Sequence, residues 1–171
     1  MALDTMETYK STRSVHSSVK VVVVLHNVYS SQRVVEAARL VYGLGFTTFV
    51  VTKASGSAAQ SGVPDAQKLA LKRGANFVYL RDLKDAIELF EPGKVLTVSE
   101  GKYGGKPLSS VLSELEQADS LMIVFGGAEP GLTMQEFNAG IHVYPDDVEE
   151  DIGAVGLIAI TLFQVLPHIK S

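Results

Sequence analysis

The stretch VKVVVVLH, residues 19–26, contains only two polar side chains and no alternation of polar with apolar positions. A β-branched run of this kind is typical of a strand buried on both faces of a parallel sheet. Similar runs follow it, separated by segments in which apolar residues recur at helical spacing. This alternation predicts an α/β fold: a single-domain, mostly parallel sheet with helices on both faces. The expected strands are residues 19–26, 46–52, 76–80, 94–98, 121–125 and 141–144.

The segments between the expected strands carry the start and stop signals of helices. Ser30 or Ser31 can cap a helix that Gly43 and Gly45 end, and Pro107 suits the first position of another. The first 18 residues are polar and lack the apolar core of a secretory signal. We therefore expect a flexible leader over residues 1–18 and one domain over residues 19–171. The expected helices are residues 31–42, 64–73, 82–90, 107–117 and 149–166.

Composition excludes several classes of protein. The chain has 171 residues and no Cys, which excludes a disulfide scaffold, a thiolate zinc site and a Cys nucleophile. The absence of Cys favours a cytoplasmic protein. The longest apolar stretch, residues 152–166, has 15 residues. A bilayer needs roughly 20 residues, so a buried helix is expected there.

Charge is distributed unevenly along the chain. The formal net charge is −4, which excludes a globally basic nucleic-acid binder. Residues 1–110 carry 14 basic and 9 acidic residues, a net of +5, whereas residues 111–171 carry 1 basic and 10 acidic residues, a net of −9. A basic part of this kind suits an anionic partner. Solvated helix faces of unequal charge would produce the same asymmetry.

The strongest local signal is GGAEPGLT, residues 126–133, which follows the expected strand LMIVF. In parallel sheets, ligands bind outside the carboxyl ends of the strands. Gly126, Gly127 and Gly131 would allow the backbone to approach a ligand closely, and Glu129 places a carboxylate there. A tight turn between a strand and a helix is the alternative. The stretch does not match the dinucleotide fingerprint G-x-G-x-x-G.

Two further segments have compositions that resemble those of ligand-binding loops. SEGKYGGK, residues 99–106, resembles a phosphate cradle, but its glycine spacing and the Pro after Lys106 exclude a Walker A loop. A mobile basic lid or a plain surface turn is expected instead. The acidic run at residues 146–151 lacks nearby His and calcium-loop spacing. We interpret it as the acidic start of a helix and predict no metal site.

Three segments, in order, resemble the SPOUT (SpoU-TrmD) superfamily of knotted RNA methyltransferases. The first is Ala38-Arg39 followed by Gly45-Phe46, and the second is IVFGGAEPGLT at residues 123–133. The third is Val143-Tyr144-Pro145 followed by residues 152–157. The resemblance implies a divergent SpoU-like member with a C-terminal trefoil knot. It also implies an S-adenosylmethionine-dependent RNA methyltransferase that acts on tRNA or rRNA, bound through the basic N-terminal part, and a homodimer.

The resemblance also implies the residues of the site. Arg39 would hold the phosphate of the acceptor nucleotide or help to activate the nucleophile, with Glu129 orienting it, because methyl transfer depends mostly on positioning. Asp151 and Gly153 stand where the family has Ser and Asn, which favours an alternative: a non-catalytic module that binds RNA or a nucleotide. S-adenosylmethionine would bind to backbone in the knot near Gly126, Gly127, Gly131, Val143, Tyr144, Ile152 and Gly153.

A nuclease is the other alternative. Pro64-Asp65 and Glu100-Gly101-Lys102 match the Pro-Asp and Asp/Glu-x-Lys pattern of the restriction-like nucleases. In that family the two carboxylates bind a divalent metal that activates water. Here Pro64-Asp65 opens an expected helix, whereas the family places both acids on adjacent strands.

Overall fold

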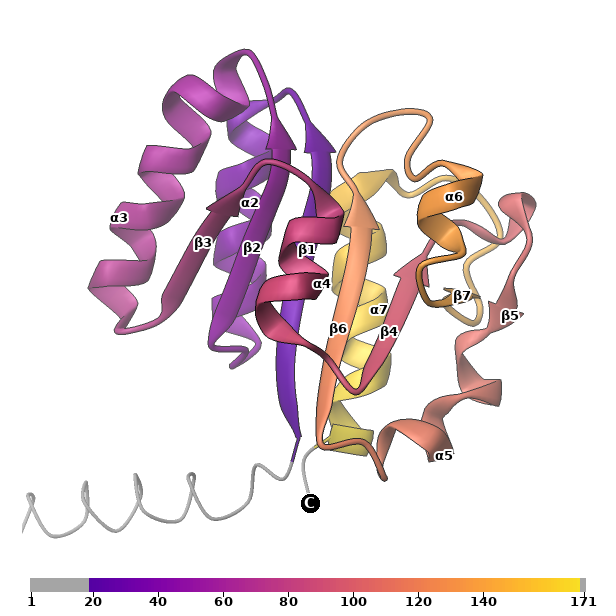
Figure 1. Cartoon of the computed structure of the whole chain (residues 1–171). Helices are drawn as coiled ribbons and strands as arrows, with labels where there is room; N and C mark the ends of the chain where they lie inside the picture. Colours follow the sequence, from indigo (N-terminus) through magenta and orange to yellow (C-terminus); the bar gives the residue numbers. More distant parts are fainter. Residues whose placement is uncertain (1–18, 170–171) are drawn as a thin grey trace, which may run out of the picture.

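The computed structural model describes residues 19–169 and contains one seven-stranded sheet (Figure 1). The order of the strands is β3-β2-β1-β6-β4-β7-β5, and every neighbouring pair is parallel. The parallel α/β sheet predicted from the sequence is thus confirmed. The strands are β1 (Lys20–Val28), β2 (Thr48–Ala54), β3 (Asn76–Leu80), β4 (Lys94–Val98), β5 (Lys106–Pro107), β6 (Ser120–Gly126) and β7 (Ile141–Tyr144).

Helices cover both faces of the sheet. α4 and α6 lie on one face, in front in Figure 1, and α2 and α7 lie behind it. Within residues 19–169, no helix combines the length and apolarity needed to cross a bilayer. The helices are α2 (Ser31–Gly43), α3 (Val63–Arg73), α4 (Leu83–Phe90), α5 (Leu112–Leu115), α6 (Met134–Phe137) and α7 (Gly153–Ile169); a π-helical turn (Ala58–Gly62) and two 3-10 turns (Gly101–Tyr103 and Leu108–Ser110) join them.

The apolar character of β1 and β6 explains why these strands form the centre of the fold. Alternate residues face opposite sides of a strand, so Val23 and Leu25 enter the larger core, which α2 and α7 cover, whereas Val24 enters the smaller one. All three side chains are fully buried.

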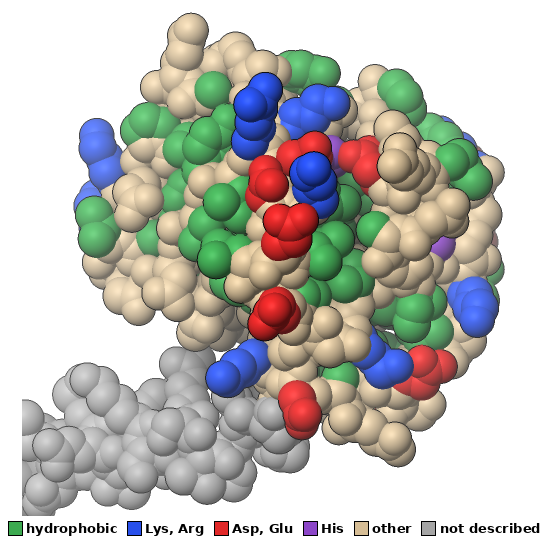
Figure 2. Space-filling view, in the orientation of Figure 1, with side chains coloured by type: hydrophobic (Ala, Val, Ile, Leu, Met, Phe, Trp, Pro, Cys, Tyr) green, Lys and Arg blue, Asp and Glu red, His purple; other side chains and the backbone are tan. Residues whose placement is uncertain are grey.

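On the face drawn in Figure 2, acidic side chains gather along the centre, over α4, with basic ones beside them. That face is therefore not a uniformly basic surface.

The structure corrects two of the expected helices. Residues 107–117 do not form one helix: Pro107 is extended, with φ −58° and ψ 136°, and pairs in β5. The hydroxyls of Ser109 and Ser110 bond to the Asp146 carboxylate and the Pro107 carbonyl, and such local bonds compete with helix formation. The last helix begins at Gly153 and not at residue 149. The expected leader, residues 1–18, lies outside the described residues.

The strand order determines where a site can form. β6 lies between β1 and β4, so segments distant in sequence leave the sheet side by side. Val98 at the end of β4 is paired with Phe125 of β6 and with Val143 of β7. The chain after β4 and the chain after β6 therefore start from the same edge of the sheet.

Candidate functional site

A cavity opens at the carboxyl ends of β4 and β6. Its walls come from the segment after β4, from the turn after β6 and from the first turn of α7. Arg33 near the start of α2 and Phe137 of α6 complete the lining. The cavity therefore lies where ligands bind in parallel α/β sheets.

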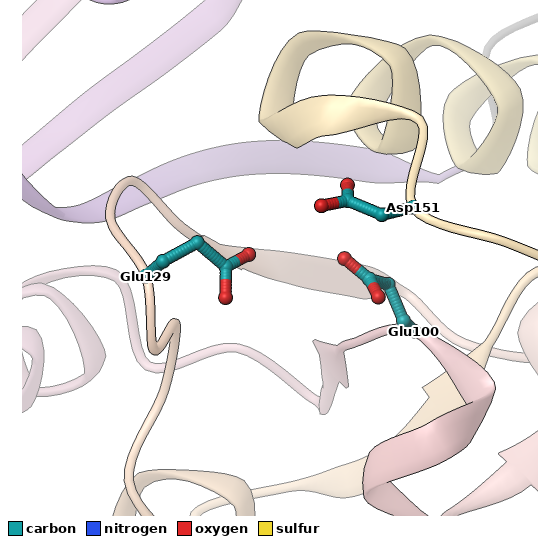
Figure 3. A group of neighbouring side chains, drawn as sticks. All are labelled: Glu100, Glu129 and Asp151. Atoms are coloured by element: carbon teal, nitrogen blue, oxygen red, sulfur yellow. The ribbon is translucent and has the colours of Figure 1, made fainter.

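Three carboxylates converge in this cavity (Figure 3). One oxygen each of Glu100, Glu129 and Asp151 lies within 4.8 Å of the others. Glu100 is half-buried, whereas Glu129 and Asp151 are exposed. Like charges at this separation repel one another, and a cation between them would remove the repulsion. Carboxylate oxygens are the ligands that Mg²⁺, Mn²⁺ and Ca²⁺ prefer.

Neighbouring donors orient each carboxylate. The Gly153 N–H donates to Oδ1 of Asp151 at 2.7 Å, and the Tyr103 hydroxyl donates to Oε2 of Glu129 at 3.3 Å. Nζ of Lys102 lies 3.3 Å from Oε2 of Glu100, and this contact raises the pKa of Lys102. Lys102 is exposed, so the pair adds little stability. The cluster of carboxylates remains negatively charged overall.

The glycine turn after β6 places Glu129 in the cavity. A Cβ on Gly127 would lie 2.6 Å from Cβ of Val28, so only glycine fits beside β1 at that position. The Gly127 N–H donates to the carbonyl of His26 at 2.7 Å. The turn is thereby fastened to the end of β1.

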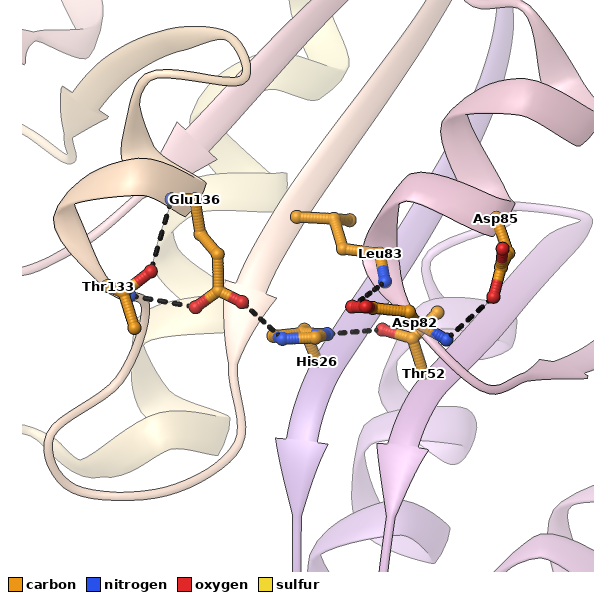
Figure 4. A network of polar contacts seen from close by, with 7 residues as sticks. All are labelled: His26, Thr52, Asp82, Leu83, Asp85, Thr133 and Glu136. Atoms are coloured by element: carbon orange, nitrogen blue, oxygen red, sulfur yellow. Dashed lines mark hydrogen bonds and ion pairs between the residues drawn. The ribbon is translucent and has the colours of Figure 1, made fainter.

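A polar network centred on a buried histidine also anchors the chain just after this turn (Figure 4). His26 is 1% exposed, and its Nδ1 lies 2.7 Å from the Thr52 hydroxyl. Its Nε2 contacts the carboxylate of Glu136, which also accepts the Thr133 N–H at 2.8 Å. An ionised carboxylate can only accept, so Nε2 carries the proton and Nδ1 accepts from Thr52. Burial lowers the pKa of His26, although Glu136 partly opposes this effect.

A serine in the cavity wall is paired with a histidine behind it. Ser99 lines the cavity, and its hydroxyl lies 2.6 Å from Nε2 of His142. The imidazole is stacked on the ring of Phe137, with centroids 3.9 Å apart. Burial lowers the pKa of His142, so the neutral imidazole is favoured. Ser99 also donates to the main-chain carbonyl of Glu100 at 2.9 Å, which connects this pair to the backbone that carries the Glu100 carboxylate.

The structure brings together only some of the residues implied by the family resemblance. Glu129, Gly126, Gly131 and Gly153 line the cavity. Gly127, Val143, Tyr144 and Ile152 are not part of its lining: Val143 is fully buried in β7, and Ile152 is 44% exposed.

Arg39 does not line the cavity either; it lies exposed on α2, and Arg33 lines the cavity instead. The two arginines are six residues apart, and at 3.6 residues per turn they point in different directions.

The nuclease motif is divided by the fold. Glu100 lies in the cavity with Lys102 beside it. Asp65 lies in the first turn of α3, which Figure 1 shows beside β3, with β2, β1 and β6 between that strand and β4 in the sheet. Asp151 supplies a carboxylate that the motif did not identify. The only sequence signal for Asp151 is the acidic run at residues 146–151, whose pattern favours the acidic start of a helix.

Comparison with known proteins identifies relatives of the chain. The model of a family described as RecB-family nuclease (DUF2122) matches residues 56–164. A candidate type II restriction enzyme of Aeropyrum pernix is 45% identical over 148 residues, 86% of this chain and 94% of that protein. One from Methanocaldococcus jannaschii is 40% identical over 147 residues, 85% of this chain and 96% of that protein.

Similar solved structures are methyltransferases. A candidate methyltransferase of Bordetella pertussis has a TM-score of 0.70 and 14% identity, with coverage of 90% of this chain and 96% of that chain. The SpoU methyltransferase AviRb of Streptomyces viridochromogenes has a TM-score of 0.65 and 12% identity, with coverage of 86% and 58%. At this identity the likeness concerns the fold alone.

The sequence matches therefore correct our functional expectation. The resemblance implied an RNA methyltransferase, and the fold does resemble that of SpoU-type enzymes. The family model and both relatives are named for nucleases or restriction enzymes. They overturn the methyltransferase interpretation and agree with the nuclease alternative.

Proposed function

Because this chain belongs to the RecB-family nuclease (DUF2122) family, we propose that it cleaves phosphodiester bonds with a divalent cation held by Glu100, Glu129 and Asp151. The observation that carries the proposal is the convergence of these three carboxylates in one cavity. The relatives are named as type II restriction enzymes, so DNA is the first substrate to test.

The donor set suits a hard cation. Its ligand atoms are all carboxylate oxygens, and the chain has no Cys that would favour a softer metal. Mg²⁺ is usually bound by a few carboxylates and keeps several waters. Two of the three carboxylates are exposed, which leaves room for water and for a phosphate.

The residues around the cation would have different roles in hydrolysis. A bound divalent cation supplies an activated water and stabilises charge on the phosphoryl oxygens. Tyr103 orients Glu129, and the Gly153 N–H orients Asp151. Lys102 places an ammonium next to Glu100, where it would offset part of the negative charge of the carboxylates. The proposal does not use Asp65.

Cleavage assays test the proposal. Plasmid and linear DNA, with single-stranded RNA in parallel, are incubated with Mg²⁺ or Mn²⁺ and with EDTA. We expect metal-dependent cleavage of DNA that Glu100→Gln and Asp151→Asn each abolish. The matched control is Glu150→Gln, an exposed acid next to Asp151 that does not line the cavity. Absence of cleavage with either metal, or cleavage that survives both site variants, would overturn the proposal.

S-adenosylmethionine is the informative competitor ligand. Its binding is an untested prediction, and three of the glycines expected to hold it, Gly126, Gly131 and Gly153, line the same cavity. Calorimetry with S-adenosylmethionine and with Mn²⁺ on the same preparation separates the two ligands. Binding of the nucleoside without binding of the cation would overturn the nuclease proposal.

Three other expectations stay predictions: the trefoil knot, the homodimer and RNA binding through the N-terminal part.

For the dimer, α7 offers apolar side chains to a partner, because Ile160 and Phe163 are 38% and 67% exposed. We propose that α7 pairs with a second copy. Sedimentation of wild type and of Phe163→Glu tests this, since a monomeric wild type would contradict it.

A further inference from the structure

Arg33 is a cation held in place by main-chain atoms. It lies in the first turn of α2, where the Ser30 hydroxyl accepts its N–H at 3.3 Å. Its Nη1 donates to the carbonyl of Gly127 at 2.5 Å. Gly127 is itself fixed by its bond to His26 and by its close packing on Val28. The guanidinium is therefore anchored by a rigid acceptor.

The guanidinium has no carboxylate partner in the described part of the chain. Within residues 19–169, no Asp or Glu carboxylate oxygen lies within 4.0 Å of a guanidinium nitrogen of Arg33. Arg33 nevertheless lines the same cavity as Glu100, Glu129 and Asp151. The cavity thus has a positive wall and a negative wall that do not neutralise each other directly.

A ligand that fits both walls must present positive charge to the carboxylates and negative charge to the arginine. A divalent cation bound to a phosphate group has this arrangement. Guanidinium donors also match phosphate oxygens in pairs, which an ammonium cannot do. One of the five N–H donors of Arg33 is used by Gly127, so others remain for an anion.

We propose that Arg33 forms an anion subsite that binds a phosphoryl oxygen of the substrate, opposite the cation held by the three carboxylates. This inference rests on the proposed function for the identity of the cation, but it makes a separate statement about Arg33. Lys102 does not take this role, because it is exposed and paired with Glu100.

Calorimetry with inorganic phosphate tests the subsite. Phosphate is titrated into wild type, Arg33→Gln, Arg33→Lys and the control Arg73→Gln, each with and without saturating Mg²⁺. Arg73 has the same charge and ends α3, away from the cavity. We expect Arg33→Gln to weaken phosphate binding about tenfold or more, the effect of losing a charged hydrogen bond. Mg²⁺ affinity should be unchanged, and Arg33→Lys should be intermediate.

The outcomes separate the two proposals. Equal phosphate affinity in wild type and Arg33→Gln, with Mg²⁺ bound normally, overturns the subsite and leaves the cation site standing. If phosphate binding depends on Arg33 but the protein binds no Mg²⁺, the cation site is overturned and the Arg33 subsite is supported. Thermal melts report whether loss of the Gly127 bond unfolds Arg33→Gln. In that event the comparison of wild type with Arg33→Lys decides, and equal affinities overturn the subsite.

Discussion

Gly126 and Gly131 touch through their backbones: a Cβ on Gly126 would lie 2.6 Å from Cα of Gly131. This contact closes the turn that carries Glu129 into the cavity. The added Cβ has a position fixed by the backbone of residue 126, and Cα of Gly131 belongs to the main chain, so no rotation of a side chain can relieve the clash.

Gly126→Ala should therefore lower the free energy of unfolding by about 1 to 3 kcal/mol, the cost of overpacking. Urea unfolding measures it. Gly43→Ala is the control, because its added Cβ would meet nothing within 4 Å at the end of α2. A Gly126→Ala variant as stable as Gly43→Ala would contradict the contact.

The buried His26 should make stability depend on pH. Its pKa is lowered in the folded protein, so folding favours the neutral ring. The stabilisation is present above the unfolded pKa of about 6.5 and is lost as the pH falls towards the folded pKa. The free energy of unfolding should drop more between pH 7.5 and 5.5 in wild type than in His26→Gln. Identical drops in the two proteins would show that the His26 pKa is not lowered.

Cation binding should stabilise the fold measurably. A ligand that binds only the native state raises the free energy of unfolding. The increase grows with the logarithm of the ratio of the ligand concentration to its dissociation constant. Mn²⁺ should raise the melting temperature of wild type and of Glu150→Gln, but not that of Asp151→Asn, and EDTA should reverse the effect. The same increase in Asp151→Asn would mean that the ion binds elsewhere.

Ser99→Ala should destabilise the protein by about 1 to 3 kcal/mol, because it removes the partner of the half-buried His142 ring. It should also weaken Mn²⁺ binding, since the hydroxyl holds the Glu100 carbonyl. Ser61→Ala removes an exposed hydroxyl of the π-helical turn and should cost less than about 0.5 kcal/mol. Calorimetry and urea unfolding measure both effects; unchanged Mn²⁺ affinity in Ser99→Ala would refute the coupling.

The sequence predicted the strands well because burial on both faces leaves a clear apolar run, as in β1 and β6. It failed for residues 107–117, where side-chain bonds of Ser109 and Ser110 to distant or local acceptors compete with helix formation. A single sequence does not show that the Asp146 carboxylate lies beside Ser109 in the fold.

The candidate site was predictable only in part. Glu129 and the glycines were found because they directly follow a strand. Asp151 and Arg33 were not among the predicted site residues, because their roles depend on the packing of α7 and α2 around β6. Sequence spacing alone does not indicate which of Arg33 and Arg39 belongs to the site. In the structure both lie on α2, and only Arg33 lines the cavity.

The short β5 at the margin of the sheet has a consequence for self-association. Its two residues are Lys106 and Pro107, and Pro107 has no amide hydrogen to offer to an incoming strand. A charged side chain and a proline at a sheet border are features that block strand-to-strand aggregation between molecules. Fibril-like stacking of copies through this border is thereby disfavoured.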